Sequence, residues 1–127
     1  MIHVASPFAM ANPANDDEYL KPAIDGTLSV MKAAQKHQIE RVVLTSSTAA
    51  ILDRTKDGET LDESHWVEIT DWLPVYNKSK ILAEKAAWDF VDELPEEEKF
   101  GLVVMNPSGI IGPTLMTEPF ESGKIVT

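Results

Sequence analysis

Tyr76 and Lys80 are the residues whose types and spacing point most directly to chemistry. Residues four apart on a helix lie on the same face, about one turn from each other. An ammonium group beside a phenol stabilises the phenolate, which lowers the tyrosine pKa from its ordinary value of roughly 10. Such a tyrosine can exchange protons near neutral pH. Because the same spacing is common in surface helices, the pair needs support from the rest of the chain.

Three short apolar segments and two amphipathic helices surround this pair. We expect strands over residues 2–5, 41–45 and 101–105, and helices over 17–37 and 75–94. The second and third strands lack alternation between apolar and polar residues, which is typical of parallel strands covered on both faces. With connections long enough for parallel crossovers, the order β-α-β-α-β predicts a piece of a doubly wound α/β fold.

The first helix should bury one apolar stripe. Its apolar residues recur at steps of three or four, which predicts a core-facing set of Leu20, Ile24, Leu28, Met31 and Ala34. Pro22 fits this helix best in the first turn, where its missing N–H group costs nothing.

Polar residues follow each expected strand at the point where the strand ends. Ser6 follows the first strand, Ser46 and Ser47 follow the second, and Asn106 to Ser108 follow the third. In parallel α/β sheets, ligands bind at the carboxyl ends of the strands. Tyr76 opens the helix between the second and third strands, so it should face the same edge. A serine hydroxyl, a phenol with its lysine and a polar cluster could converge there on a small carbonyl or alcohol.

Composition narrows the class of protein. The chain has 127 residues, a formal net charge of −10 and no cysteine. The negative charge argues against nucleic acid and anionic membranes as partners, because both attract basic surfaces. The lack of thiols leaves only His and carboxylates as metal ligands, and no metal site is predicted. With no apolar run long enough to span a bilayer and no signal-peptide pattern, a cytoplasmic protein is expected.

A series of motifs resembles the extended short-chain dehydrogenases/reductases. The matching stretches are His3 to Pro7, Thr45-Ser46-Ser47, Tyr76-x-x-x-Lys80 and Asn106-Pro107. Arg41 to Ser47, Asp62-Glu63-Ser64-x-Trp66, Ser79 to Trp88 and Gly112-Pro113 are similar to the dihydroflavonol reductase-like branch of the NAD-dependent epimerase/dehydratase family. The resemblance covers almost the whole chain and implies a Rossmann-like sheet.

The resemblance also implies roles for individual residues. Ser47 would hydrogen-bond and polarise the substrate carbonyl, Tyr76 would donate the proton, and Lys80 would hold the nicotinamide ribose and lower the Tyr76 pKa. Asn106 would lie nearer the substrate. The cofactor-binding residues implied are Val4, Ala5, Ser6, Thr45, Tyr76, Lys80, Pro107 and Ser108. The implied activity is that of an NAD(P)-dependent carbonyl reductase or alcohol dehydrogenase, with NADP(H) favoured over NAD(H), working as a monomer or homodimer.

Two features depart from the family pattern. Family members carry a glycine-rich turn that binds the pyrophosphate at a helix N-terminus, and no such turn occurs in these 127 residues. We therefore expect residues 1–127 to be the C-terminal part of a Rossmann-like domain, without that turn and without most of the substrate-binding part. Leu52 stands where plant flavonoid reductases carry a polar residue, so a flavonoid substrate is not supported and an apolar aldehyde or ketone is as plausible.

Two alternatives stay open at this point. A sugar-nucleotide epimerase or a hydroxysteroid dehydrogenase would use the same serine, tyrosine and lysine. A truncated, non-catalytic remnant is the alternative favoured by the missing glycine-rich turn.

Overall fold

A computed structural model describes residues 1–8, 15–52, 58–110 and 112. Along the chain it contains strand β1 (Ile2–His3), helix α1 (Asp17–Lys36), strand β2 (Arg41–Thr45), the short 3₁₀ helix η1 (Thr48–Ala50), helix α2 (Val75–Asp92), the 3₁₀ helix η2 (Glu96–Glu98) and strand β3 (Gly101–Met105). The predicted β-α-β-α-β order is confirmed, and the bounds of β2 and β3 are those expected from the sequence.

The three strands form one parallel sheet in the order β1-β2-β3. Ile2 pairs with Val43, and Val43 pairs in turn with Val103. The first strand is shorter than predicted, because the chain leaves the sheet after His3 and Val4 is 64% exposed. The hydroxyl of Tyr19 donates to the Pro7 carbonyl at 2.8 Å, which ties this departing segment to α1 instead of to β2.

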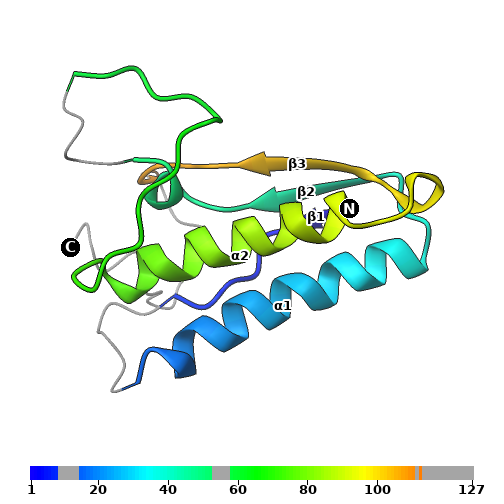
Figure 1. Ribbon diagram of the computed structural model, residues 1–127, viewed down its shortest axis with the longest axis horizontal. Coiled ribbons are helices and arrows are strands. Elements are labelled where there is room, and N and C mark those ends of the chain that lie inside the picture. The colour runs from blue at the N-terminus through cyan, green and yellow to red at the C-terminus, as the bar shows by residue number, and fades with distance from the viewer. Residues whose placement is uncertain (9–14, 53–57, 111, 113–127) are drawn as a thin grey trace.

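Both helices pack on the same face of the sheet and run antiparallel to the strands (Figure 1). The carboxyl ends of the strands therefore lie at the end of the molecule where the helices begin. Between the two layers is a core of seven buried residues: Met31, Ala34, Val42, Leu44, Ala87, Val91 and Phe100. A second small core joins η1 to α2 through Ala50, Val67 and Ile81.

The buried face of α1 differs from the predicted stripe over its first half. The buried positions are Tyr19, Ala23, Thr27, Met31 and Ala34, whereas Leu20, Ile24 and Leu28 are only partly buried. Small side chains allow two helices to approach closely, and Ala23 and Thr27 lie on the face of α1 that is buried. The helix begins at Asp17, so Pro22 lies inside it, beyond the first turn where a proline fits best.

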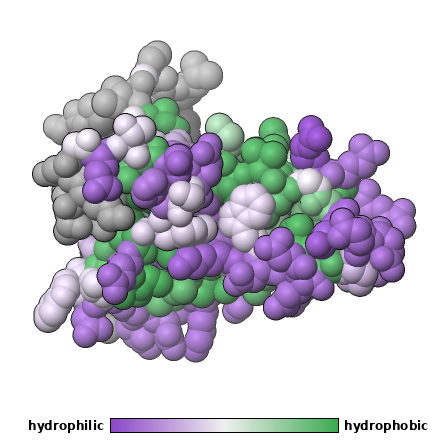
Figure 2. All heavy atoms as spheres, turned by 45° about the horizontal axis from the view of Figure 1, so that its top comes forward, coloured by the Kyte–Doolittle hydropathy of each residue, from purple (hydrophilic) through white to green (hydrophobic). Residues whose placement is uncertain are grey.

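The opposite face of the sheet stays largely open within the described residues. Val42 and Leu44 point toward the helices, so their neighbours in the alternation point away. Val103 and Met105 of β3 are paired with such neighbours, Val43 and Thr45. Val103 is 42% exposed and Met105 55%, and Ile2, also paired with Val43, is 73% exposed. Figure 2, which brings the top of Figure 1 with β3 forward, shows apolar surface bordered by hydrophilic side chains. The predicted cover on both faces of β2 and β3 is thus present on only one face here.

Candidate active site

The loops after β2 and β3 are joined at the carboxyl edge of the sheet. The Ser46 amide donates to the Met105 carbonyl at 2.8 Å, and the Thr48 amide donates to the Pro107 carbonyl at 3.0 Å. Helix α2 begins at the same end of the sheet (Figure 1). The sequence prediction that Ser47, Tyr76 and Asn106 share this edge is consistent with that arrangement.

Ser47 is held in a single orientation. It precedes η1 with extended backbone angles, and its Oγ accepts the Ala49 amide hydrogen at 3.1 Å. A hydroxyl has one hydrogen to donate besides its acceptor lone pairs. Because the Ala49 contact uses a lone pair, the hydroxyl hydrogen of Ser47 can still be donated to a carbonyl oxygen.

Tyr76 and Lys80 are neighbours on α2. The Lys80 Nζ lies 5.7 Å from the centroid of the Tyr76 ring, and the Phe8 ring meets the Tyr76 ring edge-on at 5.4 Å. Lys80 is only 8% exposed. Burial lowers the pKa of the Lys80 ammonium, because water stabilises the charged form more than the protein interior does. The proposed effect of Lys80 on the Tyr76 pKa stays a prediction.

Asn106 has both hydrogens of its amide nitrogen in hydrogen bonds. Its Nδ2 donates to the Ser47 carbonyl at 3.1 Å and to Glu84 Oε2 at 2.9 Å. An asparagine amide nitrogen carries two hydrogens, and the amide oxygen accepts. Asn106 can therefore offer only its Oδ1 atom to a substrate, as an acceptor.

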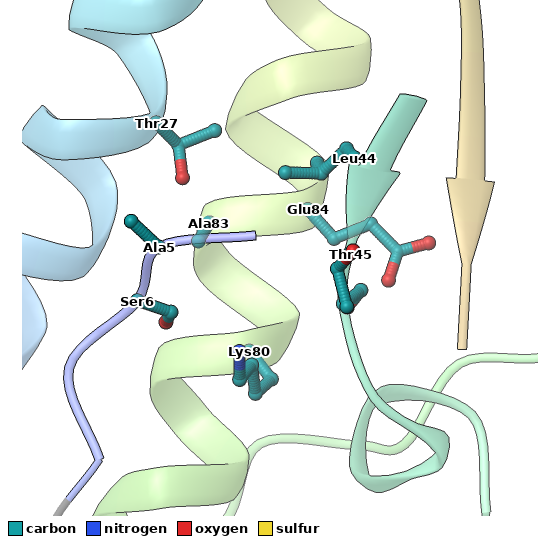
Figure 3. Close-up of a pocket in the computed structure, with 9 residues that line it drawn as sticks. Ala5, Ser6, Thr27, Leu44, Thr45, Lys80, Ala83 and Glu84 are labelled. Atoms are coloured by element: carbon teal, nitrogen blue, oxygen red, sulfur yellow. The ribbon is translucent and has the colours of Figure 1, made fainter. Parts of the chain in front are cut away.

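A small cavity of about 10 Å³ opens beside Lys80 (Figure 3). That is close to the smallest space that holds one water molecule. Ser46 lines it, and the Ser46 Oγ is the one buried side-chain polar atom of the described chain without a hydrogen-bond partner. The full lining is Ala5, Ser6, Thr27, Leu44, Thr45, Ser46, Lys80, Ala83 and Glu84.

The cavity brings together only some of the predicted cofactor residues. Ala5, Ser6, Thr45 and Lys80 line it. Val4, Pro107 and Ser108 are not among its lining residues, so their predicted roles stay predictions.

Sequence reasoning missed two residues at this site. They are Phe8, which touches the Tyr76 ring, and Glu84. For Glu84 a signal was available, since it follows Lys80 by four residues and so lies on the same helix face. Phe8 reaches the site only through the path of its loop, which residue spacing does not indicate.

Asp62 stabilises the loop before α2 instead of forming part of the site. Its Oδ1 accepts the Ser64 amide at 2.9 Å and the Ser64 hydroxyl at 2.7 Å. These bonds, followed by one to His65, lower the pKa of Asp62 to about 2. This carboxylate therefore caps the turn at Ser64. Within the described residues, no three His, Asp or Glu side chains are grouped as a metal site would require.

Comparison with known proteins relates this geometry to reductases. The 3-beta hydroxysteroid dehydrogenase/isomerase family matches residues 1–120. The NADPH-dependent methylglyoxal reductase of Saccharomyces cerevisiae is 35% identical over 91% of this chain and 37% of its own length. Tetraketide alpha-pyrone reductase 1 of Arabidopsis thaliana is 42% identical over 91% of this chain and 36% of its own. An anthocyanidin reductase of Vitis vinifera is 38% identical over 93% of this chain and 36% of its own length.

A solved structure supports the fold assignment. The crystal structure of the yeast methylglyoxal/isovaleraldehyde reductase with NADPH superposes with a TM-score of 0.78 at 33% identity. The superposed region covers 91% of this chain and 37% of the yeast reductase chain. The chain thus spans little more than a third of the relatives it matches. None of the helices in the described part has the length and apolar character needed to cross a membrane.

Proposed function

Since the chain belongs to the 3-beta hydroxysteroid dehydrogenase/isomerase family, we propose that it carries the catalytic groups of an NADP(H)-dependent oxidoreductase. The predicted relationship to the epimerase/dehydratase-type reductases is confirmed at the family level, and the roles of Ser47, Tyr76 and Lys80 are part of the proposal. One observation carries the proposal: the Ser47 hydroxyl hydrogen can be donated at the edge of the sheet where Tyr76 and Lys80 lie together.

The three residues divide the work on a carbonyl substrate. Ser47 donates its hydroxyl hydrogen to the carbonyl oxygen and draws electron density toward that oxygen. Tyr76 transfers its phenolic proton to the oxygen as the carbon is reduced, which turns the carbonyl into an alcohol. Lys80 stabilises the phenolate left on Tyr76, because the positively charged Lys80 Nζ lies 5.7 Å from the centroid of the Tyr76 ring.

The side chains around the cavity fit one part of a nicotinamide cofactor. Ser6, Thr45, Ser46 and Lys80 are hydrogen-bonding side chains that could hold a ribose, and the unpartnered Ser46 Oγ is one such group. When bound, NADPH would supply the hydride that reduces the carbonyl carbon. NADPH is preferred to NADH in this proposal because the relatives' names specify it.

The substrate is proposed to be a small apolar aldehyde or ketone. Phe8 contacts the Tyr76 ring and is 38% exposed. Leu52, whose amide donates to the carbonyl of Thr48 next to Ser47, is 49% exposed. The reductase names of the relatives favour reduction over alcohol oxidation. We further propose a cytoplasmic protein acting as a monomer or homodimer.

A kinetic experiment tests the function, using the protein in the longest form that its gene encodes. Loss of NADPH absorbance would be followed with methylglyoxal, isovaleraldehyde and a 3-ketosteroid as substrates. We expect Tyr76→Phe to lower kcat by roughly a hundredfold or more, because a positioned proton donor contributes that much. Calorimetry should show NADPH binding to the variant largely unchanged.

Ser47→Ala should also lower kcat strongly, and it has a matched control. Ser29→Ala removes a hydroxyl that bonds only to the Asp25 carbonyl on the exposed side of α1. That control should keep full activity. Parent-like turnover in Tyr76→Phe would refute the assigned role, and preference for the ketosteroid would move the substrate proposal toward steroids.

A further inference from the structure

Glu84 is a buried carboxylate outside the three groups assigned to catalysis. It lies on α2, one turn beyond Lys80, and is 5% exposed. Removing a charged carboxylate from water is costly unless hydrogen bonds compensate. The compensating bond here comes from the Asn106 amide nitrogen at 2.9 Å. Figure 3 shows the Glu84 side chain extending from α2 toward the end of β2.

The same amide nitrogen connects Glu84 to Ser47. Asn106 Nδ2 also donates to the Ser47 carbonyl, at 3.1 Å, and that carbonyl accepts the Ala50 amide as well. Three separate segments thus meet at one nitrogen: helix α2, the loop after β3 and the loop after β2. Ser47 is held at its carbonyl by this nitrogen and at its hydroxyl oxygen by Ala49.

The acceptor oxygens of Glu84 determine which way the Asn106 amide faces. An asparagine side chain can rotate so that its oxygen and nitrogen exchange places. In the exchanged orientation the Asn106 oxygen would meet a carboxylate and a carbonyl, and both would repel it. A carboxylate is also a stronger acceptor than a neutral group. Glu84 therefore keeps the nitrogen on Ser47 and leaves Oδ1 as the free atom of Asn106.

From these contacts we propose that Glu84 is a positioning residue that acts through Asn106 to fix the placement of Ser47. The proposal rests on the function proposed above, because Ser47 matters for catalysis only if that function holds. It assigns Asn106 a part in the support of Ser47 in addition to any contact with the substrate.

Kinetics of Glu84 variants test the proposal in the longest gene-encoded form of the protein. Glu84→Ala should lower kcat about tenfold, because a hydrogen bond to a charged group is lost. The KM for NADPH should change less than twofold, since Glu84 is not assigned to the cofactor. Glu84→Gln keeps a side-chain carbonyl to accept from Asn106, so it should retain most of the activity. Glu93→Gln, at the exposed C-terminal end of α2, is the matched control.

A double-mutant cycle separates positioning from general destabilisation. If Glu84 acts through Asn106, adding Glu84→Ala to Asn106→Ala should lower kcat no further. Additive effects, or a full loss in Glu84→Gln at unchanged thermal stability, would overturn the proposal. Rates would be expressed per NADPH-binding site, so that a fraction of unfolded protein does not mimic a loss in kcat.

An NMR measurement tests the geometry without relying on activity. In the parent protein the two Nδ2 hydrogens of Asn106 should exchange slowly with solvent. In Glu84→Ala one of them should lose protection, and the Ala49 and Ala50 amide signals should shift. Unchanged signals would overturn the positioning role even in an active enzyme. If the signals change as expected while Ser47→Ala leaves activity intact, the proposed function fails and the positioning contact stands.

Discussion

Replacing Lys80 by methionine should stabilise the fold even though it removes a proposed catalytic group. Lys80 is 8% exposed, and burial lowers its pKa, so its charged form is destabilised in the folded protein. Methionine has similar length and no charge. Relief of the buried charge should contribute about 2 kcal/mol.

One favourable contact is lost at the same time. The Lys80 ammonium lies 5.7 Å from the Tyr76 ring centroid, and a cation at this distance is attracted by about 0.5–1 kcal/mol. The net gain is therefore about 1 kcal/mol, which corresponds to a rise in Tm of about 4 °C for a domain of this size. Thermal unfolding at pH 7 followed by circular dichroism would measure it, with Lys32→Met, at an exposed position of α1, as the control.

The gain should depend on pH in a defined direction. With a lowered pKa, folded Lys80 binds its proton less tightly than unfolded Lys80, whose pKa is 10.5. The penalty is complete below the folded-state pKa and disappears as the pH rises toward 10.5. The advantage of Lys80→Met should shrink over the same interval. A lower Tm at pH 7, or an advantage that does not change with pH, would refute this reasoning.

His3 gives a second signal for the same substitution. Partial burial lowers the pKa of His3, and the positive charge of Lys80 lowers it further. In Lys80→Met the second cause is gone, so the His3 pKa should rise. NMR titration of the His3 ring protons would detect the change.

Two further perturbations test other parts of the structure. Ile81→Ala creates a cavity at a fully buried position in the small core between η1 and α2. In chemical denaturation it should lower the free energy of unfolding by about 3 kcal/mol, and Ile81→Val by about 1 kcal/mol. Equal losses for the two variants would contradict tight packing at this position. The Asp62 loop should keep its hydrogen bonds until the pH approaches about 2, the pKa of Asp62 in the folded protein. A carboxyl pKa that is lower in the folded than in the unfolded protein stabilises the fold at pH values above the unfolded-state pKa, and this stabilisation is lost as the pH falls to the folded-state pKa. The Ser64 amide signal should therefore titrate near that pH in the parent and not in Asp62→Asn, and a midpoint near 4 would contradict the assigned bonds.

Local spacing was sufficient to predict several elements of this protein. The bounds of β2 and β3, the start of both helices and the pairing of Tyr76 with Lys80 all follow from the sequence. Helix geometry brings residues four apart together whatever the rest of the chain does. For the same reason, the order of strands and helices was enough to predict a parallel sheet with polar residues at one edge.

The tertiary structure decided which atoms are available for chemistry. Asn106 lies 59 residues from Ser47 and 22 from Glu84, yet its amide nitrogen bonds to both. The buried face of α1 was likewise set by contact with its neighbours, which brought Tyr19 into the core in place of Leu20. Residue types and spacing alone identified Tyr76, Lys80 and Ser47 as candidates. The hydrogen bond at the Ser47 carbonyl and the single free atom of Asn106 depend on how distant loops pack, because hydrogen bonds between such segments form only once the fold brings them together.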